Sequence, residues 1–321
     1  MSKRVLSGVK PSGRPHIGNY FGAMRQFVEL ARNHETFVFV ADYHAMNSVH
    51  DGEVLRQNII DVALDYLAIG LDPKEVVLFK QSDLPEHTEL CWIFNTLTTM
   101  PYLQRAHAYK DALAKNAEIN VGTFDYPILM AADILLYDPD IVPVGADQKQ
   151  HVEYARDTAE KFNRTYGDTF TLPEAYIPKE VAVIPGIDGQ KMSKSYNNTI
   201  PLFATDEEVR KLVMSIVTDS KGTNEPKDPD ACNVFALHKL VTKDLSDVEL
   251  RYREGSIGYK ESKELLAESI IELIAPLREK RDELAKDISL VKKILTDGAE
   301  KARTVASQKM AEVRQKVGVS L

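Results

Sequence analysis

Short apolar runs alternate with helical patterns in the first half of the chain. The runs are rich in β-branched and aromatic residues and lack polar alternation, which is typical of strands buried on both faces of a parallel sheet. They cover residues 37–41, 76–79, 141–144 and 181–184. Between the first two, residues 55–67 carry an apolar stripe at helical spacing that ends before Gly70. This order predicts an α/β fold with a parallel sheet.

Strand-like runs disappear after about residue 195, and amphipathic helical patterns replace them. Helices are predicted at residues 206–217, 234–241, 260–273, 280–295 and 299–317. A polar segment rich in turn-forming residues, 221–230, separates the first two of these helices. We therefore expect a smaller, all-helical domain after the α/β domain.

Net charge restricts the contacts that this protein can make with nucleic acid. The chain has 321 residues, with 40 lysines and arginines against 48 acids, a formal charge of −8. Because phosphate neutralisation dominates non-specific binding, a general nucleic-acid coat protein is excluded and any RNA contact must be local. Residues 291–321 hold seven basic against three acidic side chains, a local balance of +4. That segment is either a solvated helix face or part of an RNA-binding surface.

Cysteine content and the N-terminal sequence indicate the cellular compartment of the protein. Cys91 and Cys232 are the two cysteines, too few for a multi-bridge disulfide framework or a four-cysteine metal site. Residues 1–8 lack the long apolar segment of a secretory signal, and no apolar stretch is long enough to span a membrane. The sequence predicts a soluble, cytoplasmic protein with reduced thiols.

A loop rich in glycine, proline and serine, residues 7–20, lies between a predicted strand and a helical pattern at 21–31. Glycines allow a ligand to approach the backbone, and a helix start offers N–H groups to anions. His16 can donate to charge that develops on a phosphate, and Gly18 would let a nucleoside pack on the backbone. The alternative is a strand–helix turn without a ligand.

A second loop, residues 189–195, carries Lys191 and Lys194 among small hydroxyl residues. Lysines are mobile point charges that suit a pyrophosphate leaving group, and such a loop can close over substrate. The alternative is a solvated basic loop.

Asp133 interrupts an otherwise apolar stretch, residues 126–137. A buried carboxylate needs a partner, so Asp133 is either a paired structural acid or a ligand contact. His44 follows a predicted buried strand, and open α/β sheets bind ligands at the carboxyl ends of strands. That placement favours a pocket role for His44 over a structural one.

Two separated motifs resemble those of the class I aminoacyl-tRNA synthetases. Residues 16–19 (His-Ile-Gly-Asn) look like the HIGH signature, and residues 191–195 match the KMSKS signature in full, about 175 positions later. Within the tyrosyl/tryptophanyl subgroup, residues 11–13, 130–135 and 142–151 are similar to bacterial-type tryptophanyl-tRNA synthetases. The resemblance runs from residue 7 to beyond residue 240.

This resemblance implies an aminoacyl-tRNA ligase with a Rossmann-like catalytic domain over residues 1–195. A dimerisation segment at about 66–134 would be inserted in it, with the KMSKS loop at its end. Residues 196–321 would form a helical anticodon-binding domain whose last helix packs back on the catalytic domain. The implied reaction activates tryptophan with ATP and transfers it to tRNA(Trp). ATP, Mg²⁺, tRNA(Trp), tryptophan and a second copy of the chain are the implied ligands and partners, without a dedicated metal site.

The resemblance also assigns residues. The catalytic residues are His16, Lys191 and Lys194. The ATP contacts are Lys10, Pro11, Ser12, Gly18, Asn19, Gly145, Ala146, Asp147, Ile184, Lys191, Met192, Ser193, Lys194 and Ser195. The tryptophan contacts are Gly8, His44, Tyr126, Met130, Asp133, Val142, Val144 and Gln148. In the family, the residue matching Asp133 accepts the indole N–H.

The chain departs from the family pattern at two positions. Lys10 stands where glutamine is common, and Ala146 stands where many relatives carry an acid. Position 16 itself varies in the family, so a requirement for His16 does not follow from the motif.

Three other functions remain open from the sequence. A tyrosyl-tRNA synthetase is disfavoured by the context of residues 130–133 and 145–151. A phosphopantetheine-type nucleotidylyltransferase shares the HIGH-like turn but lacks the KMSKS loop and the helical domain. A synthetase-like paralogue that only binds RNA is disfavoured by the presence of His16, Gly18, Lys191 and Lys194.

Overall fold

The computed structural model describes residues 3–114, 118–144, 149–176 and 183–320. The chain forms two compact units. Unit 1 comprises Met1–Gly13, Phe27–Pro178 and Asp287–Leu321, and unit 2 comprises Arg14–Gln26 and Lys179–Lys286. The domain limits expected from the sequence, 1–195 and 196–321, differ from these contact-based limits and stay a prediction.

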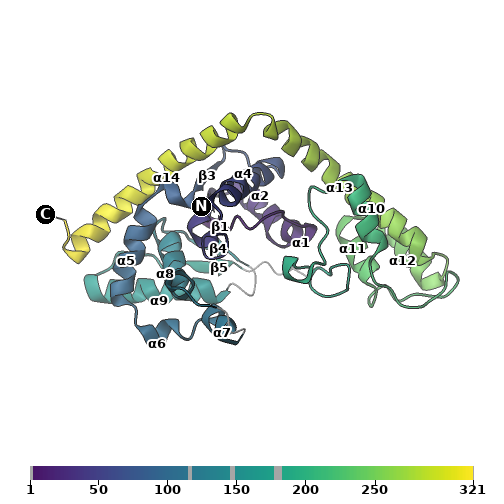
Figure 1. The fold of residues 1–321 in the computed structure, drawn as a ribbon, viewed down its shortest axis with the longest axis horizontal. Helices are drawn as coiled ribbons and strands as arrows, with labels where there is room; N and C mark the ends of the chain where they lie inside the picture. Colours follow the sequence, from purple (N-terminus) through teal and green to yellow (C-terminus); the bar gives the residue numbers. More distant parts are fainter. Residues whose placement is uncertain (1–2, 115–117, 145–148, 177–182, 321) are drawn as a thin grey trace. The chain divides into compact units, whose positions relative to one another are not determined.

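A five-stranded parallel sheet forms the centre of unit 1 (Figure 1). Its strand order is β3-β2-β1-β4-β5. The strands are β1 (Arg4–Val9), β2 (Glu35–Val40), β3 (Val76–Lys80), β4 (Ile141–Pro143) and β5 (Glu174–Tyr176). The apolar runs at 37–41, 76–79 and 141–144 coincide with β2, β3 and β4, and the predicted α/β fold class is confirmed. Of the fourth run, 181–182 lie outside the described residues, and Val183 and Ile184 are not in a strand.

Helices connect and cover these strands. In unit 1 they are α3 (Asp42–Ala45), α4 (Gly52–Ala68), α5 (Glu86–Leu97), α6 (Met100–Leu103), α7 (His107–Ala114), α8 (Val121–Leu135), α9 (Lys149–Tyr166) and α14 (Ile288–Val317), with a 3-10 turn η2 (Gln81–Asp83). The predicted helix at 55–67 is α4, whose first turn is capped by the Asp51 carboxylate. Gly70 follows with a positive φ of 109°, as its role in ending the helix requires.

The last helix of unit 1, α14, packs against β3 and α5 (yellow in Figure 1). Its buried face is made of small and apolar residues, among them Ala299, Ala302 and Ala306, which belong to the same core as the sheet. Small side chains let the helix approach closely, which raises the contact area that each apolar atom buries.

Basic side chains on α14 also contact the rest of unit 1. Arg314 donates to both carboxylate oxygens of Glu89 on α5, and Arg303 donates to the backbone oxygen of Asp83. Lys309 forms an ion pair with Asp138 at 2.6 Å. The +4 segment is therefore neither a fully solvated helix face nor an unengaged basic surface, because part of its positive charge holds α14 in place.

Unit 2 is mainly helical. Its elements are α1 (Ile17–Asn19), a π-helical turn η1 (Tyr20–Met24), a 3-10 turn η4 (Lys194–Tyr196), α10 (Asp206–Met214), α11 (Asn233–Val241), α12 (Leu245–Glu254) and α13 (Tyr259–Ala285). Helix α2 (Arg25–Ala31) follows η1 and belongs to unit 1 from Phe27 onward. Helix α13 packs on α10 and α11 (Figure 1). In the polar segment at 221–230, the buried Lys227 donates to the backbone oxygens of Gly222 and Glu225.

Several predicted helix limits were wrong. The predicted break at 274–279 is absent, because α13 continues through Pro276 to Ala285. The predicted gap at 296–298 is also absent, because α14 is continuous from Ile288 to Val317. Helix α12 and strand β5 were not predicted. No helix in the described part of the chain is long and apolar enough to cross a membrane.

Candidate active site

The carboxyl ends of the strands in unit 1 carry many of the predicted site residues. Lys10, Pro11 and Ser12 follow β1, and His44 lies in α3, directly after β2. Strand order reverses between β1 and β4, and ligands of open α/β sheets bind at such a switch point. Gly8 in β1 faces Phe39 of β2, whose ring would meet a Cβ on Gly8 at 2.5 Å. The absence of a side chain at position 8 therefore leaves space for the Phe39 ring.

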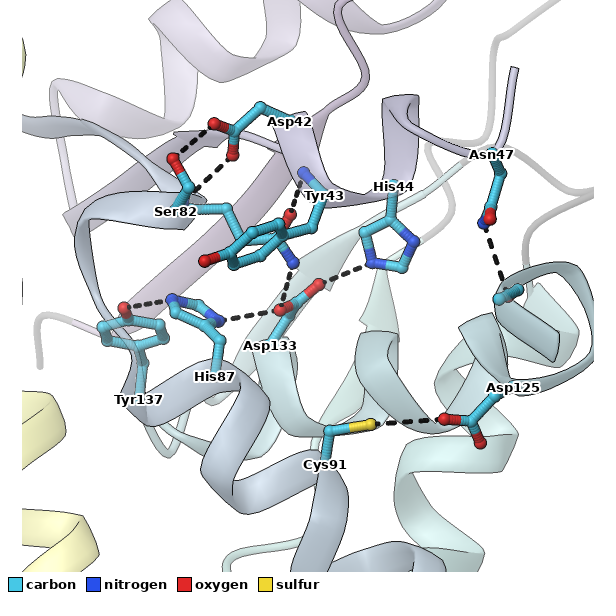
Figure 2. Close-up of polar contacts among 12 residues, drawn as sticks. Asp42, Tyr43, His44, Asn47, Ser82, His87, Cys91, Asp125, Asp133 and Tyr137 are labelled. Atoms are coloured by element: carbon cyan, nitrogen blue, oxygen red, sulfur yellow. Dashed lines mark hydrogen bonds and ion pairs between the residues drawn. The ribbon is translucent and has the colours of Figure 1, made fainter. Parts of the chain in front are cut away.

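Asp133 is the centre of a buried polar network (Figure 2). It lies near the end of α8 and is 1% exposed. Its Oδ1 accepts hydrogen bonds from Gln81 Nε2 at 2.8 Å and from His87 Nδ1 at 2.7 Å. Its Oδ2 accepts from His44 Nε2 at 2.8 Å. Asp133 is therefore buried, and it has the hydrogen-bond partners that a buried carboxylate requires.

Hydrogen bonding keeps this carboxylate ionised. Burial alone would raise the pKa of Asp133, but hydrogen bonds from His44 and His87 outweigh it and lower the pKa to about 2. Asp133 therefore carries a negative charge at neutral pH in a site that water barely reaches.

The acceptor capacity of Asp133 is not fully used by the described residues. A carboxylate has about four acceptor positions. Among the described residues, Oδ1 accepts from two donors and Oδ2 from His44 alone. Oδ2 can therefore accept one further N–H or O–H group, from a ligand next to His44.

Two other predicted residues share the Asp133 face of α8. Tyr126 and Met130 precede it by seven and three residues, which is helical spacing for one face. The Tyr126 hydroxyl lies 3.0 Å from His151 Nε2, and its ring meets that of His44 edge-on. Met130 is half-buried against the core. Aromatic and thioether groups therefore flank the open acceptor.

The remaining predicted tryptophan contacts lie at the end of β4. Val142 is buried in the main core, and Val144 is partly buried against it. Gly145, Ala146, Asp147 and Gln148 lie outside the described residues, so their predicted contacts stay predictions.

Unit 2 holds the residues of the HIGH-like motif. His16 is buried and caps α1, since its Nδ1 accepts from the Asn19 amide at 3.2 Å. The Asn19 side chain accepts from the His16 amide in return at 3.1 Å. A Cβ on Gly18 would come within 2.8 Å of the His16 ring. Glycine at position 18 is therefore what allows the ring to take this position.

His16 is neutral at physiological pH. Burial, together with the positive charge of Lys194, lowers its pKa to about 4. Because Nδ1 accepts the capping bond, the ring proton is on Nε2. His16 thus offers one neutral N–H donor, the form predicted for contact with a phosphate.

The KMSKS loop is tied to the segment that follows it. Asn198 is buried and accepts from the Ser193 amide at 2.8 Å, while its amide group donates to the Lys191 backbone oxygen at 3.1 Å. The buried Met192 donates its amide to the Ile184 oxygen at 2.8 Å. Lys191, Lys194 and Ser195 are exposed. The backbone of the loop is fixed by these hydrogen bonds, whereas the side chains of both lysines are exposed.

Sequence reasoning missed three members of the Asp133 network, namely Gln81, His87 and Tyr137. Gln81 directly follows β3, so the carboxyl-end rule that selected His44 could also have selected Gln81. Tyr137 lies four residues after Asp133, a helical spacing that could have linked the two residues. Nothing in the local sequence marks His87, which the folding of α5 against α8 brings to Asp133 and Tyr137.

Residues 2–275 match the family model of the class I tRNA synthetases for tryptophan and tyrosine (W and Y). The match covers more than half of the chain, and the chain belongs to this family. The parallel sheet and the two signature loops are in keeping with it.

Several relatives with more than 40% identity are named tryptophan–tRNA ligases. A tryptophan–tRNA ligase of Fusobacterium nucleatum is 49% identical over 320 residues, covering 99% of this chain and 98% of the relative. One of Rhodopirellula baltica is 49% identical over 318 residues, covering 98% and 99%. The crystal structure of the Campylobacter jejuni tryptophanyl-tRNA synthetase complexed with ADP and tryptophan has a TM-score of 0.93 and 48% identity, covering 98% of this chain and 99% of that one. The predicted membership in the tryptophanyl branch is confirmed.

Proposed function

We propose that this protein is a tryptophan–tRNA ligase. It activates L-tryptophan with ATP to tryptophanyl-adenylate and diphosphate, and it then transfers the acyl group to tRNA(Trp), releasing AMP. The observation that carries this function is identity of about half of all positions, over nearly the full length, with relatives of that name.

The tryptophan site is proposed at the Asp133 network. An indole has one N–H donor and no acceptor, and Oδ2 of Asp133 has one acceptor position left beside His44. Tyr126 and Met130 would contact the ring faces, and Gly8, Val142, Val144 and Gln148 would complete the walls. Such a site disfavours amino acids without a ring N–H, because one acceptor position of the buried carboxylate would then stay unfilled.

The ATP contacts are proposed as the family resemblance implies them. In unit 1 they are Lys10, Pro11, Ser12, Gly145, Ala146 and Asp147. In unit 2 they are His16, Gly18, Asn19, Ile184 and residues 191–195. The exposed Lys191 and Lys194 would neutralise the β- and γ-phosphates, and the neutral His16 Nε2–H would stabilise charge on the transferring phosphate.

Neither chemical step needs a covalent enzyme intermediate. The tryptophan carboxylate attacks the α-phosphorus, and diphosphate leaves, so rate enhancement comes from alignment and from electrostatic stabilisation. Mg²⁺ is proposed to enter with ATP, because phosphate oxygens are the hard ligands that it prefers. Among the described residues, no group of three or more His, Cys, Asp or Glu side chains could hold a metal ion.

We also infer a homodimer that uses the segment around residues 66–134. Trp92 on α5 is 72% exposed, and Met100 and Val121 are exposed as well. Exposed large apolar side chains favour a protein–protein contact. The helical part of the chain, expected over residues 196–321, is proposed to bind the anticodon region of tRNA(Trp), and a cytoplasmic location is proposed with it.

One experiment tests the function against its alternatives. Exchange of pyrophosphate into ATP is measured with each of the twenty amino acids, and charging of tRNA(Trp) is measured with the best one. Exchange with tryptophan alone, followed by charging, is the expected result. Exchange with tyrosine would indicate a tyrosyl enzyme, and absence of exchange would indicate an RNA-binding paralogue.

A further inference from the structure

His87 is a fully buried histidine that links Asp133 to Tyr137 (Figure 2). Its Nδ1 lies 2.7 Å from Asp133 Oδ1, and its Nε2 lies 2.9 Å from the Tyr137 hydroxyl. It comes from α5, whereas Asp133 comes from α8. Both ring nitrogens therefore have partners, and one of these partners is the proposed indole acceptor.

The partners determine where the protons are. An ionised carboxylate only accepts, so the proton between the two groups is on His87 Nδ1. When the ring carries only that proton, Nε2 accepts a hydrogen bond from the Tyr137 hydroxyl. In that form the hydrogen bonds run in one direction, from Tyr137 through His87 to Asp133, and successive bonds in such a chain strengthen one another.

Gln81 completes the arrangement on the same oxygen. Its Nε2 donates to Asp133 Oδ1 at 2.8 Å, and its Oε1 accepts from the Tyr43 amide at 3.1 Å. The backbone contact fixes which end of the amide faces Asp133. Oδ1 is thus held by two donors from protein, and rotation of the carboxylate would break both bonds.

We propose that His87 is a positioning residue for substrate selection, which holds Oδ1 of Asp133 so that Oδ2 faces the ring N–H of the amino acid. Tyr137 supports it by fixing the tautomer of the His87 ring. The inference rests on the proposed role of Asp133. Its consequence is that tryptophan selectivity depends on a side chain that does not touch tryptophan.

A structural role for His87 predicts something different. The ring also packs among Phe39, Phe79 and Tyr137, at centroid distances of 5.8, 6.3 and 5.6 Å. Loss of packing would weaken the whole site and lower activity equally for any amino acid that fits. Loss of positioning would affect only substrates that use the N–H contact.

The test compares tryptophan with its benzothiophene analogue, which has a ring sulfur in place of the N–H. The value of kcat/KM in pyrophosphate exchange is measured for both in the wild type, His87→Leu, His87→Asn and Tyr137→Phe. Asparagine places an amide nitrogen near the position of Nδ1, so it should restore the donor. His238→Asn is the matched control, because His238 is also fully buried but lies in unit 2 and does not belong to the Asp133 network.

We expect the wild type to prefer tryptophan and His87→Leu to reduce this preference by roughly tenfold or more, as expected for one hydrogen bond to a charged group. His87→Asn should recover most of it, Tyr137→Phe should fall between them, and His238→Asn should leave it unchanged. If His87→Leu keeps the wild-type preference, His87 has no positioning role. Where His87→Leu does not fold, a Tyr137→Phe variant with the full wild-type preference overturns the proposal. If the wild type itself has no preference, the proposed Asp133 contact and this inference both fail, whereas tryptophan-dependent exchange would still support the ligase function.

Discussion

Gly298 of α14 lies against the backbone of Leu78 in β3, so that a Cβ atom at position 298 would come within 1.9 Å of the Leu78 carbonyl oxygen. Inside a helix, alanine normally stabilises over glycine by about 1 kcal/mol. Here the added methyl group has no space, and the neighbour is backbone, which cannot move aside easily.

Gly298→Ala should therefore destabilise unit 1, by about 1–3 kcal/mol as for other overpacked sites. Urea unfolding followed by circular dichroism measures this change. Gly52→Ala is the control, since its Cβ would meet a flexible Arg56 side chain at 3.5 Å, and it should be neutral or slightly stabilising. Equal effects of the two substitutions would contradict the close contact.

Arg314 and Glu89 provide a second test of how α14 is held. The side chains are about 38% and 39% exposed, so we expect Arg314→Gln to cost no more than about 1 kcal/mol. A double-mutant cycle with Glu89→Gln measures the pair itself. Since Arg314 is engaged within the protein, tRNA(Trp) affinity should change little, with Lys301→Gln as the exposed control on the same helix. A large loss of tRNA affinity without loss of stability would assign Arg314 to the RNA surface instead.

Asp133→Asn should lower kcat/KM for tryptophan by roughly 100-fold or more, because His44, His87 and Gln81 all donate to this group and an amide offers one oxygen only. Pyrophosphate exchange with tryptophan and with phenylalanine measures the change. Asp125→Asn, two turns earlier on α8, is the matched control. Retained discrimination between the two amino acids would disprove the proposed indole contact.

Lys194→Ala should slow tryptophan-dependent pyrophosphate exchange by about 100-fold, the loss expected for one transition-state charge contact. Tryptophan affinity, measured by equilibrium dialysis, should change little. Lys211→Ala on α10, also exposed, serves as the control. Unchanged exchange in Lys194→Ala would remove this lysine from the mechanism.

Two buried histidines in unit 2 predict a pH dependence of stability. Burial lowers the pKa of His238 to about 4, and burial together with Lys194 lowers the pKa of His16 to about 4. In the unfolded chain both have a pKa near 6.5, so the unfolded state binds more protons between these values. Stability is full above pH 6.5 and falls as the pH decreases toward 4, by up to about 1.4 kcal/mol per pH unit for each histidine.

Urea unfolding between pH 7 and 4.5 measures this slope. His238→Asn should reduce this slope by the contribution of one histidine. The variant should be less stable at every pH, because Ser262 and Thr242 each lose one hydrogen-bond partner. A slope in the wild type that is unchanged by His238→Asn would contradict the buried neutral histidine.

The central strands could be predicted because they are buried on both faces, so that 37–41 and 76–79 are almost purely apolar. Strand β5 could not, because Glu174–Tyr176 is a short edge strand with two of its three residues exposed. Gly298 and Pro276 are residues that usually end helices. Each is accommodated inside a helix here, Gly298 because of a tertiary contact that the sequence does not display.

The candidate site was predictable to the extent that it follows strands or matches motifs. His44 follows β2, and Asp133 is a charge in an apolar stretch, so both could be selected. His87 could not, because its proximity to Asp133 arises from the packing of α5 against α8 rather than from any local pattern. Tyr137 lies four residues after Asp133, but its role depends on its contact with His87.

The return of α14 to unit 1 also sets an order of events during synthesis. Residues 299–313 of this helix supply part of the core around the sheet, yet they follow all of unit 2 in the sequence. On the ribosome, unit 1 therefore exposes an apolar face until the whole of unit 2 has been made, and partly folded chains expose such faces to aggregation. The nascent chain is thus most in need of chaperone protection while residues 179–286 are being translated, long after the signature loop at 16–19 has emerged.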